Sequence, residues 1–432
     1  MKRKIILILA FLLLLNQNIL YAAEEKVLTP EEIAEEERIK QEELERKKKE
    51  AWEKAVNKVK DYSTDDLTTA YLLGDFASGK ILEFKNIDEP VAIASISKII
   101  SIYVVMDEIS KGNISKNDVV RIDKETAAIR GSSYDLKEGM EVKVEDLIIA
   151  SLVVSGNDAV TALSKYVAGT ESNFVIMMEK KLDELGIKNF KIVNSSGLPD
   201  YENEVQNMMT VRGLFILSRS IIKDYPEILE YTKIKEIDEK NREFKSENTN
   251  PILGEIPEVD GLKTGYTGLA GRCIIATGMQ KEIENERADM RLIGITMGSK
   301  SDASRYVAIK KLMNHGFSDY EYRILGDINS PIEMHKDENA IPEEFGLYPE
   351  KSVSILSSTE DSISISKEIF DYTLPIKQGE QIGEVTYYLN GEEKLKTSLI
   401  VKEEIKETSW VSRLNRLYKE LFEKVETALN GI

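Results

Sequence analysis

The sequence contains few of the residues that form disulfide bonds or metal sites. Among 432 residues there are one cysteine, Cys273, and two histidines, His315 and His335. A single cysteine excludes an internal disulfide and a thiolate zinc cluster, and two histidines leave little for metal ligation. A Ser-His-Asp hydrolase would have to use one of these histidines as its base. We therefore expect no cofactor and no metal, and we look for lysine as the base of any catalytic serine.

Basic residues are also in the minority. The chain has 58 lysines and arginines against 76 aspartates and glutamates, which gives a formal net charge of -18. Such a charge repels phosphate backbones, so we expect no nucleic-acid partner. The length is too great for one compact domain and leaves room for two folded units with extensions.

The N-terminus combines basic residues with an apolar run, in MKRKIILILAFLLLLNQNILYAAEE. We interpret residues 1–23 as a secretory signal peptide, because the run from Ile5 to Leu15 is short for a spanning helix. Leu20 or Tyr21 stands where a cleavage site prefers a small residue, so an uncleaved anchor is the alternative. Either interpretation predicts an exported protein.

Residues 24–60 are dominated by glutamate and lysine. Thr29, Pro30 and Glu32 form a helix-start signal, with a capping threonine, proline at the first helical position and the glutamate of a capping box. Apolar residues are too sparse for a buried stripe, so the pattern predicts a solvated helical stalk without a chemical role.

Residues 61–320 show strands at both ends and helices between them. TAYLLGDFASGKILEFKN predicts a β-hairpin, and GRCIIATGM and MRLIGITMG predict buried strands. Helical patterns run over 95–111, 144–167 and 171–185, and SDASRYVAIKKLMNHGF predicts a helix that ends at Gly316. Strands and helices in this order indicate one α/β (α+β) domain.

Beyond residue 320 the pattern changes to alternation of polar and apolar residues. Residues 321–407 predict a small all-β domain, with Asn390-Gly391 as a hairpin turn. Residues 408–432 predict an amphipathic helix whose apolar face carries Trp410, Leu414, Leu417, Leu421, Val425 and Leu429. We expect this helix to lie in a membrane surface; docking on the β domain or self-association are the alternatives.

The pattern Ser-x-x-Lys occurs three times and could mark an activated serine. Ser364 and Lys367 lie in an alternating stretch, where residues three apart on a strand point to opposite faces. The pair Ser220 and Lys223 fits a solvated helix face, with the lysine in the last turn. Neither pair is expected to react.

The first pair, Ser95 and Lys98, begins a helix that is apolar nearly all round and is therefore predicted to be buried. One helical turn apart, the lysine amine can reach the serine hydroxyl. The amine must be neutral to accept a proton, and burial with a second cation such as Lys263 would lower its pKa. Two more motifs follow in order, Ser155/Asn157 in a loop between apolar helices and Lys263/Thr264/Gly265 beside a strand.

These motifs resemble those of the low-molecular-weight penicillin-binding proteins of the D-alanyl-D-alanine carboxypeptidase type, serine peptidase family S11. The resemblance extends to GSSYDLKEG, LIIASLVVSGNDAVTAL, NSSGLPD, VDGLKTGYTGLAG and RLIGITMG, and covers nearly everything from Ala70 to Phe317. It implies a serine β-lactamase/DD-peptidase-like fold, a central antiparallel sheet flanked by helices. The β domain and terminal helix also look like that family's C-terminal domain and membrane anchor.

The resemblance further implies a serine-type carboxypeptidase that removes the terminal D-alanine from peptidoglycan stem peptides through an acyl-enzyme. By this likeness the catalytic residues are Ser95, Lys98 and Ser155, with Ser155 relaying a proton to the leaving amine. The substrate-binding residues are Asn157, Lys263, Thr264, Gly265 and Tyr266, with Lys263 and Thr264 receiving the terminal carboxylate. The N–H groups of Ser95 and Tyr266 would form the oxyanion hole. β-Lactam antibiotics would also be bound, and the protein would work at the extracytoplasmic face of the bacterial cell membrane.

Two other functions share these motifs. A serine β-lactamase needs fast deacylation, which one major class achieves with a glutamate-activated water, and no convincing match for that glutamate loop is present. A catalytically silent wall-binding homologue is the second alternative, although all the catalytic positions are filled.

Overall fold

The computed structural model describes residues 29–200 and 202–430. The chain divides into two units, residues 1–61 and 62–432. The predicted signal peptide lies outside the described residues. In the first unit, helix α2 (Pro30–Asn57) begins at the capping box of Thr29 and Glu32 and buries none of its residues. This agrees with the predicted solvated helix.

The second unit contains a five-stranded antiparallel sheet in the order β2-β1-β12-β10-β9. Its strands are β1 (Ala70–Asp75), β2 (Ile81–Lys85), β9 (Val259–Thr267), β10 (Gly271–Gln280) and β12 (Met290–Ser299). The first two and the last three strands are far apart in sequence, as the predicted pattern requires. Strand β9 is an edge strand, so one side of its backbone is not paired within the sheet.

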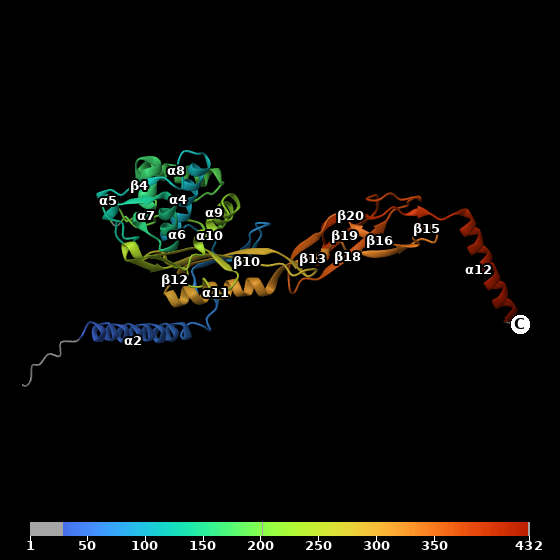
Figure 1. Cartoon of the computed structure of the whole chain (residues 1–432), viewed down its shortest axis with the longest axis horizontal. Coiled ribbons are helices and arrows are strands. Elements are labelled where there is room, and N and C mark those ends of the chain that lie inside the picture. The colour runs from blue at the N-terminus through green and yellow to red at the C-terminus, as the bar shows by residue number, and fades with distance from the viewer. Residues whose placement is uncertain (1–28, 201, 431–432) are drawn as a thin grey trace, which may run out of the picture. The chain divides into compact units, whose positions relative to one another are not determined.

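Helices cover both faces of this sheet (Figure 1). One face carries α4 (Lys98–Ser110), α6 (Val144–Val153), α7 (Asn157–Ala168), α8 (Glu171–Glu184), α9 (Val211–Asp224) and α10 (Ile228–Thr232), and the other carries α11 (Asp302–Asp319). Neighbouring strand residues serve different cores: Leu72 packs with the larger helical group, whereas Leu73 packs with α11. This follows from the alternation of side chains along a strand.

Short elements complete this part. They are α3 (Thr64–Leu67), β3 (Val91–Ala92), the 3₁₀ turn η1 (Ala94–Ser97), β4 (Val119–Arg121), α5 (Lys124–Ala127), β5 (Glu141–Lys143), β6 (Met208–Met209), β7 (Glu236–Glu239), the 3₁₀ turn η2 (Lys240–Arg242), β8 (Phe244–Glu247) and β11 (Arg287–Ala288). Strand β3 pairs with β6 directly before η1. This pairing anchors the chain immediately upstream of Ser95.

Helix α11 does not end at Gly316, as the sequence pattern suggested, but continues to Asp319. A Cβ atom at Gly316 would lie 2.7 Å from Leu292 and 3.0 Å from Leu73. The glycine is therefore needed for close packing of the helix on the sheet, and not for termination.

The remaining strands form a β-rich part with its own core, which includes Phe345, Leu347, Val385 and Leu399. Strands β13 (Tyr320–Gly326) and β17 (Val353–Ser358) join β11 in a three-stranded sheet. A five-stranded sheet has the order β14 (Glu333–Lys336), β16 (Glu344–Pro349), β20 (Glu392–Ile400), β19 (Gln381–Leu389), β18 (Ile363–Ile369), and β15 (Ala340–Ile341) pairs with β21 (Lys406–Glu407). The chain ends with helix α12 (Trp410–Asn430).

The β19–β20 hairpin turns at Asn390 and Gly391, where both residues have positive φ, 53° and 80°. This is the backbone that an Asn-Gly turn favours. The predicted turn is therefore confirmed. The predicted fold class is also confirmed: a helix-flanked antiparallel sheet, a β-rich part and a terminal helix.

Candidate active site

Ser95 lies in the 3₁₀ turn η1, which rests against the edge strand β9. The α-helix itself starts at Lys98, three residues later than predicted. Gly265 of β9 permits the close approach, because a Cβ atom there would lie 3.1 Å from the carbonyl oxygen of Ile93 and 3.2 Å from the backbone nitrogen of Ser95. Ala94 has φ 46°, a left-handed conformation that is uncommon for a residue with a side chain. The serine is therefore held in a tight and strained turn.

The amine of Lys98 has three close partners. Its Nζ lies 3.0 Å from Oγ of Ser95, 2.7 Å from Oδ1 of Asn157 and 2.9 Å from the carbonyl oxygen of Ser196. The amide and carbonyl oxygens can only accept hydrogen bonds. A neutral amine has two N–H groups for these two oxygens, which leaves its lone pair for the hydroxyl of Ser95. The geometry therefore suits transfer of the hydroxyl proton to lysine.

Burial favours the neutral form of Lys98. The side chain is fully buried, and the pKa of its amine lies well below the usual value for lysine. Desolvation is the main cause, and the charge of Lys263 is the second, whereas Asp158 acts in the opposite direction. The lowered pKa favours the role of a general base for this amine.

The loop between α6 and α7 brings Ser155 and Asn157 to this lysine. Asn157 is the first residue of α7, and its Nδ2 donates to the carbonyl oxygen of Arg130 at 2.9 Å. This contact turns the Oδ1 atom toward Lys98. Ser155 is buried and has φ 63°. Its hydroxyl makes no hydrogen bond to any residue that the structure describes, so it is not committed to a structural contact.

Lys263 is buried on β9 and donates to the carbonyl oxygen of Thr264 at 3.0 Å. Burial and then the charge of Arg305 lower the pKa of Lys263 to about 7. Arg305 belongs to α11 and is itself largely buried. A lysine and an arginine side chain therefore lie near each other at the edge strand, and this arrangement favours a bound anion.

Thr264 and Tyr266 differ in their surroundings. The Thr264 hydroxyl donates to Oγ1 of Thr249 at 2.7 Å. The Tyr266 side chain is 54% exposed, and the guanidinium of Arg272 stacks over its ring at 3.5 Å from the centroid. Arg272 also pairs with Asp302 at 3.1 Å. Arg272 therefore supports an exposed aromatic ring.

Residues in the NSSGLPD stretch support the site, although the sequence alone pointed to no role for them. The Ser196 carbonyl accepts a hydrogen bond from Lys98. Gly197 is needed for packing, because a Cβ atom there would lie 1.9 Å from the carbonyl oxygen of Ala94. Asn207 donates to Oγ of Ser97 at 2.9 Å, and that hydroxyl donates to the same Ala94 carbonyl at 2.7 Å. These contacts fix the turn that carries Ser95.

The other two Ser-x-x-Lys pairs lie elsewhere. Ser220 and Lys223 are on α9, with the lysine side chain exposed to solvent. Ser364 and Lys367 are on strand β18, and Lys367 forms an ion pair with Glu333. Within residues 29–200 and 202–430 there is also no group of three His, Cys, Asp or Glu side chains that could hold a metal ion.

A serine hydroxyl facing a buried lysine whose pKa is lowered, next to the edge strand of this fold, is the arrangement of a serine hydrolase with a lysine base. Comparison with protein families narrows this class. Residues 57–301 match the D-alanyl-D-alanine carboxypeptidase family, and residues 328–407 match the C-terminal domain of penicillin-binding protein 5. The chain therefore belongs to the D-alanyl-D-alanine carboxypeptidase family, whose members are hydrolases.

Similarity to individual members of this family supports the assignment. The chain is 30% identical to D-alanyl-D-alanine carboxypeptidase DacF of Bacillus subtilis over 346 residues, covering 78% of this chain and 86% of that protein. It is 31% identical to DacC of Escherichia coli over 366 residues, covering 80% and 86%. Penicillin binding protein 5 from Haemophilus influenzae superposes with a TM-score of 0.59 at 28% identity, covering 79% of this chain and 98% of that one.

Penicillin-binding protein D2 from Listeria monocytogenes, solved in a cefotaxime-bound form, has a TM-score of 0.52 and is 28% identical, covering 59% of this chain and 98% of that one. Binding of a β-lactam is thus a property of a structural relative.

Proposed function

We propose that this protein is a D-Ala-D-Ala carboxypeptidase in which Ser95 is the nucleophile and Lys98 its base. Lys98 takes the hydroxyl proton, and the oxygen of Ser95 attacks the carbonyl between the last two D-alanines of a peptidoglycan stem peptide. The C–N bond breaks, D-alanine leaves, and water then hydrolyses the acyl-enzyme. The observation that carries this proposal is the buried amine of Lys98, whose pKa is lowered, at 3.0 Å from the serine oxygen.

The other site residues have roles that fit this reaction. The backbone N–H groups of Ser95 and Tyr266 would stabilise the oxyanion, and Ser155, whose hydroxyl is uncommitted, would pass a proton to the leaving amine. Asn157 would orient Lys98 and bind the substrate backbone. Gly265 would allow the substrate to approach the edge of β9.

The terminal carboxylate is proposed to bind at Lys263 and Thr264. A buried lysine with a pKa of about 7 gains charge when an anion binds beside it, because an opposite charge favours the protonated form. A fixed cation that meets a free carboxylate favours cutting at a chain end. This specificity would make the enzyme an exopeptidase.

The reaction can be tested by measuring D-alanine release from a D-Ala-D-Ala-terminated stem pentapeptide. We expect release by the wild type, and a loss of roughly a thousandfold or more in Ser95→Ala and in Lys98→Ala, because nucleophile and base act as a unit. Absence of release by the folded wild type would favour the silent homologue. Rapid, continuing turnover of penicillin would instead favour the β-lactamase alternative.

We further propose that α12 attaches the protein to the outer face of the cell membrane. Trp410 is 74% exposed and Phe422 is 67% exposed, and Leu417 and Leu421 are also exposed on this helix. Aromatic and aliphatic side chains along one face, with charged residues opposite, suit an interfacial helix. Among residues 29–200 and 202–430, no helix combines the length and apolarity that a membrane crossing requires. The side chain of Leu429 lies outside the described part.

Sedimentation with lipid vesicles tests this attachment. We expect the wild type to pellet with vesicles and a double variant, Leu417→Gln with Leu421→Gln, to stay in solution. A matched control, Glu420→Gln with Glu423→Gln, changes the same helix on its charged side and should pellet like the wild type. Failure of the wild type to pellet, or a monomer–dimer change caused by the leucine variant alone, would contradict membrane attachment.

Export and domain limits are part of the same proposal. Residues 1–23 would direct export, and 24–60 would form a stalk. The catalytic domain would cover 61–320, which contains both cores of the helix-flanked sheet, and the β domain would cover 321–407, which has a separate core. The terminal helix would occupy 408–432.

A further inference from the structure

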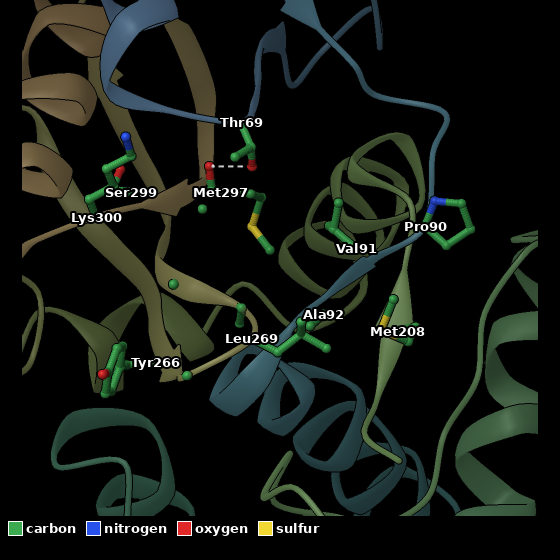
Figure 2. A pocket seen from close by; sticks show the side chains of 14 residues that line it. Thr69, Pro90, Val91, Ala92, Met208, Tyr266, Leu269, Met297, Ser299 and Lys300 are labelled. Atoms are coloured by element: carbon green, nitrogen blue, oxygen red, sulfur yellow. Dashed lines mark hydrogen bonds between the residues drawn. The ribbon is translucent and has the colours of Figure 1, made fainter. Parts of the chain in front are cut away.

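A cavity of about 540 Å³ opens beside Tyr266, where the strands of the helix-flanked sheet end. It is lined by β3, by the turn between β9 and β10, and by the last residues of β12. Val91 and Met208 lie on one side of it, and Ser299 and Lys300 lie on the other (Figure 2). Apart from Tyr266, none of its lining residues belongs to the proposed catalytic group.

The order of residues along β9 indicates which part of a substrate would reach this cavity. Thr264 is the proposed contact of the terminal carboxylate, and the N–H group of Tyr266, two residues on, is the proposed contact of the carbonyl that is attacked. Each residue of an extended strand advances about 3.3 Å. Continuing in the same direction leads to Gly268–Gly271, the turn that lines the cavity. The amino-terminal side of the substrate, which becomes the acyl group, therefore faces it.

The walls of the cavity combine apolar and polar surfaces. Val91, Met208 and Met297 provide apolar contacts, and Leu269 is 73% exposed at the rim. The Ser299 side chain is buried, and its hydroxyl has no hydrogen-bond partner among residues 29–200 and 202–430. Unpartnered buried hydroxyls are uncommon in proteins. Its Oγ atom has almost no accessible surface, so Ser299 contributes to the wall of the cavity and offers no hydrogen bond to a bound group.

Lys300, next in sequence, is exposed and makes no ion pair with any acidic side chain in the described part of the chain. The protein has a net charge of -18, so a lysine without an ion-pair partner at the rim of a cavity is a local site that attracts an anion. A carboxylate could accept hydrogen bonds from the Lys300 amine. The apolar wall would meanwhile contact the methylene and methyl groups of a peptide.

We propose that this cavity is a second subsite, which binds an acidic residue of the stem peptide upstream of the bond that is cut. Lys300 holds the carboxylate, and Val91 and Met297 contact the peptide chain. The inference rests on the proposed carboxypeptidase function and deepens it, because it makes the enzyme selective for the upstream part of its substrate as well as for the D-alanine end.

Three peptides that end in D-Ala-D-Ala provide the test. The first is a pentapeptide with one upstream side-chain carboxylate, the second is the same peptide with that group converted to an amide, and the third is a short N-acetylated tripeptide without an acidic residue. For the wild type, we expect kcat/KM for the carboxylate peptide to exceed that for the amide peptide roughly fivefold, the upper range for an exposed charge pair. Lys300→Glu should abolish or reverse this ratio and leave the short peptide unchanged.

Lys351→Glu is the matched control, because Lys351 is exposed in the β-rich part and the charge change is identical. This variant should retain the wild-type ratio. Thermal unfolding of each variant reports whether the fold is intact. The proposal is overturned if Lys300→Glu leaves the ratio unchanged, or if it lowers kcat/KM equally for all three peptides. A wild type that cleaves none of the peptides would refute the proposed function instead.

Discussion

Asn157 presents its Oδ1 atom to the amine of Lys98 at 2.7 Å, although the two residues are 59 positions apart. The opposite end of the same amide donates to the carbonyl oxygen of Arg130 at 2.9 Å. These two contacts fix the orientation of the Asn157 amide. The acceptor next to Lys98 is therefore an uncharged amide oxygen and not a carboxylate. A neutral neighbour does not raise the pKa of the amine, as a negative charge would.

Asn157→Asp tests this relationship with almost no change in size. A carboxylate beside Lys98 would stabilise the protonated amine and raise its pKa, so the base would be charged at neutral pH. We expect the rate of acylation by penicillin to fall roughly tenfold to a hundredfold at neutral pH, within the usual range for general-base catalysis. The rate should recover in part as the pH rises and the amine loses its proton.

The control is Asn173→Asp, an equivalent change at the exposed start of α8. It should leave acylation at the wild-type rate at every pH. An Asn157→Asp variant that acylates at the wild-type rate, or one whose deficit is the same at all pH values, would show that the charge state of Lys98 does not limit the reaction.

We expect kcat/KM to fall at low pH and to fall again as the pH rises above about 7. On the acid side, Lys98 becomes protonated as the pH drops through its lowered pKa, and the base is lost. On the alkaline side, Lys263, with a pKa of about 7, loses the positive charge that binds the carboxylate. Lys263→Arg keeps its charge at all these pH values, so we expect the alkaline fall to move to higher pH. If the wild type and Lys263→Arg lose kcat/KM at the same alkaline pH, the proposed role of Lys263 in binding the carboxylate is contradicted.

Gly197 and Gly186 form a matched pair for testing the support under Ser95. Both have positive φ, 80° and 71°, but a Cβ atom at Gly186 would meet nothing within 4 Å, whereas one at Gly197 would overlap the Ala94 carbonyl. We expect Gly186→Ala to lower the free energy of unfolding by about 1 kcal/mol through its backbone alone. Gly197→Ala should cost about 3 kcal/mol or more and also slow acylation. Chemical denaturation and penicillin labelling measure these effects.

Equal stability losses in the two alanine variants would contradict the packing argument. Loss of stability at Gly197 with unchanged acylation would show that the turn carrying Ser95 does not depend on this contact.

Much of the fold could be predicted because its signals are local. The hairpin at Asn390 and Gly391 has the turn residues that its backbone requires, and the alternation of Leu72 and Leu73 between two cores follows from the period of a strand. The end of α11 was predicted wrongly, because a glycine that permits close packing has the same appearance in a sequence as one that ends a helix. Only the surrounding side chains, Leu292 and Leu73, distinguish the two.

The site was predictable to the extent that its residues stand in short motifs. Ser95 and Lys98 are one turn apart, so their contact follows from helical spacing. The Ser196 carbonyl and Arg305 could not be found in this way. A backbone oxygen contributes no side-chain signal, and Arg305 resembles any arginine on an amphipathic helix until the sheet brings Lys263 next to it.

Labelling with a fluorescent penicillin tests the central claim most directly, namely that of the three Ser-x-x-Lys pairs only Ser95 with Lys98 forms a covalent acyl-enzyme. Wild type, Ser95→Ala and Ser364→Ala are incubated with the probe, and the covalent adduct is measured after denaturing electrophoresis. We expect equal labelling of the wild type and Ser364→Ala, and none of Ser95→Ala. A labelled Ser95→Ala protein, or a Ser364→Ala protein that is folded and unlabelled, would contradict the account.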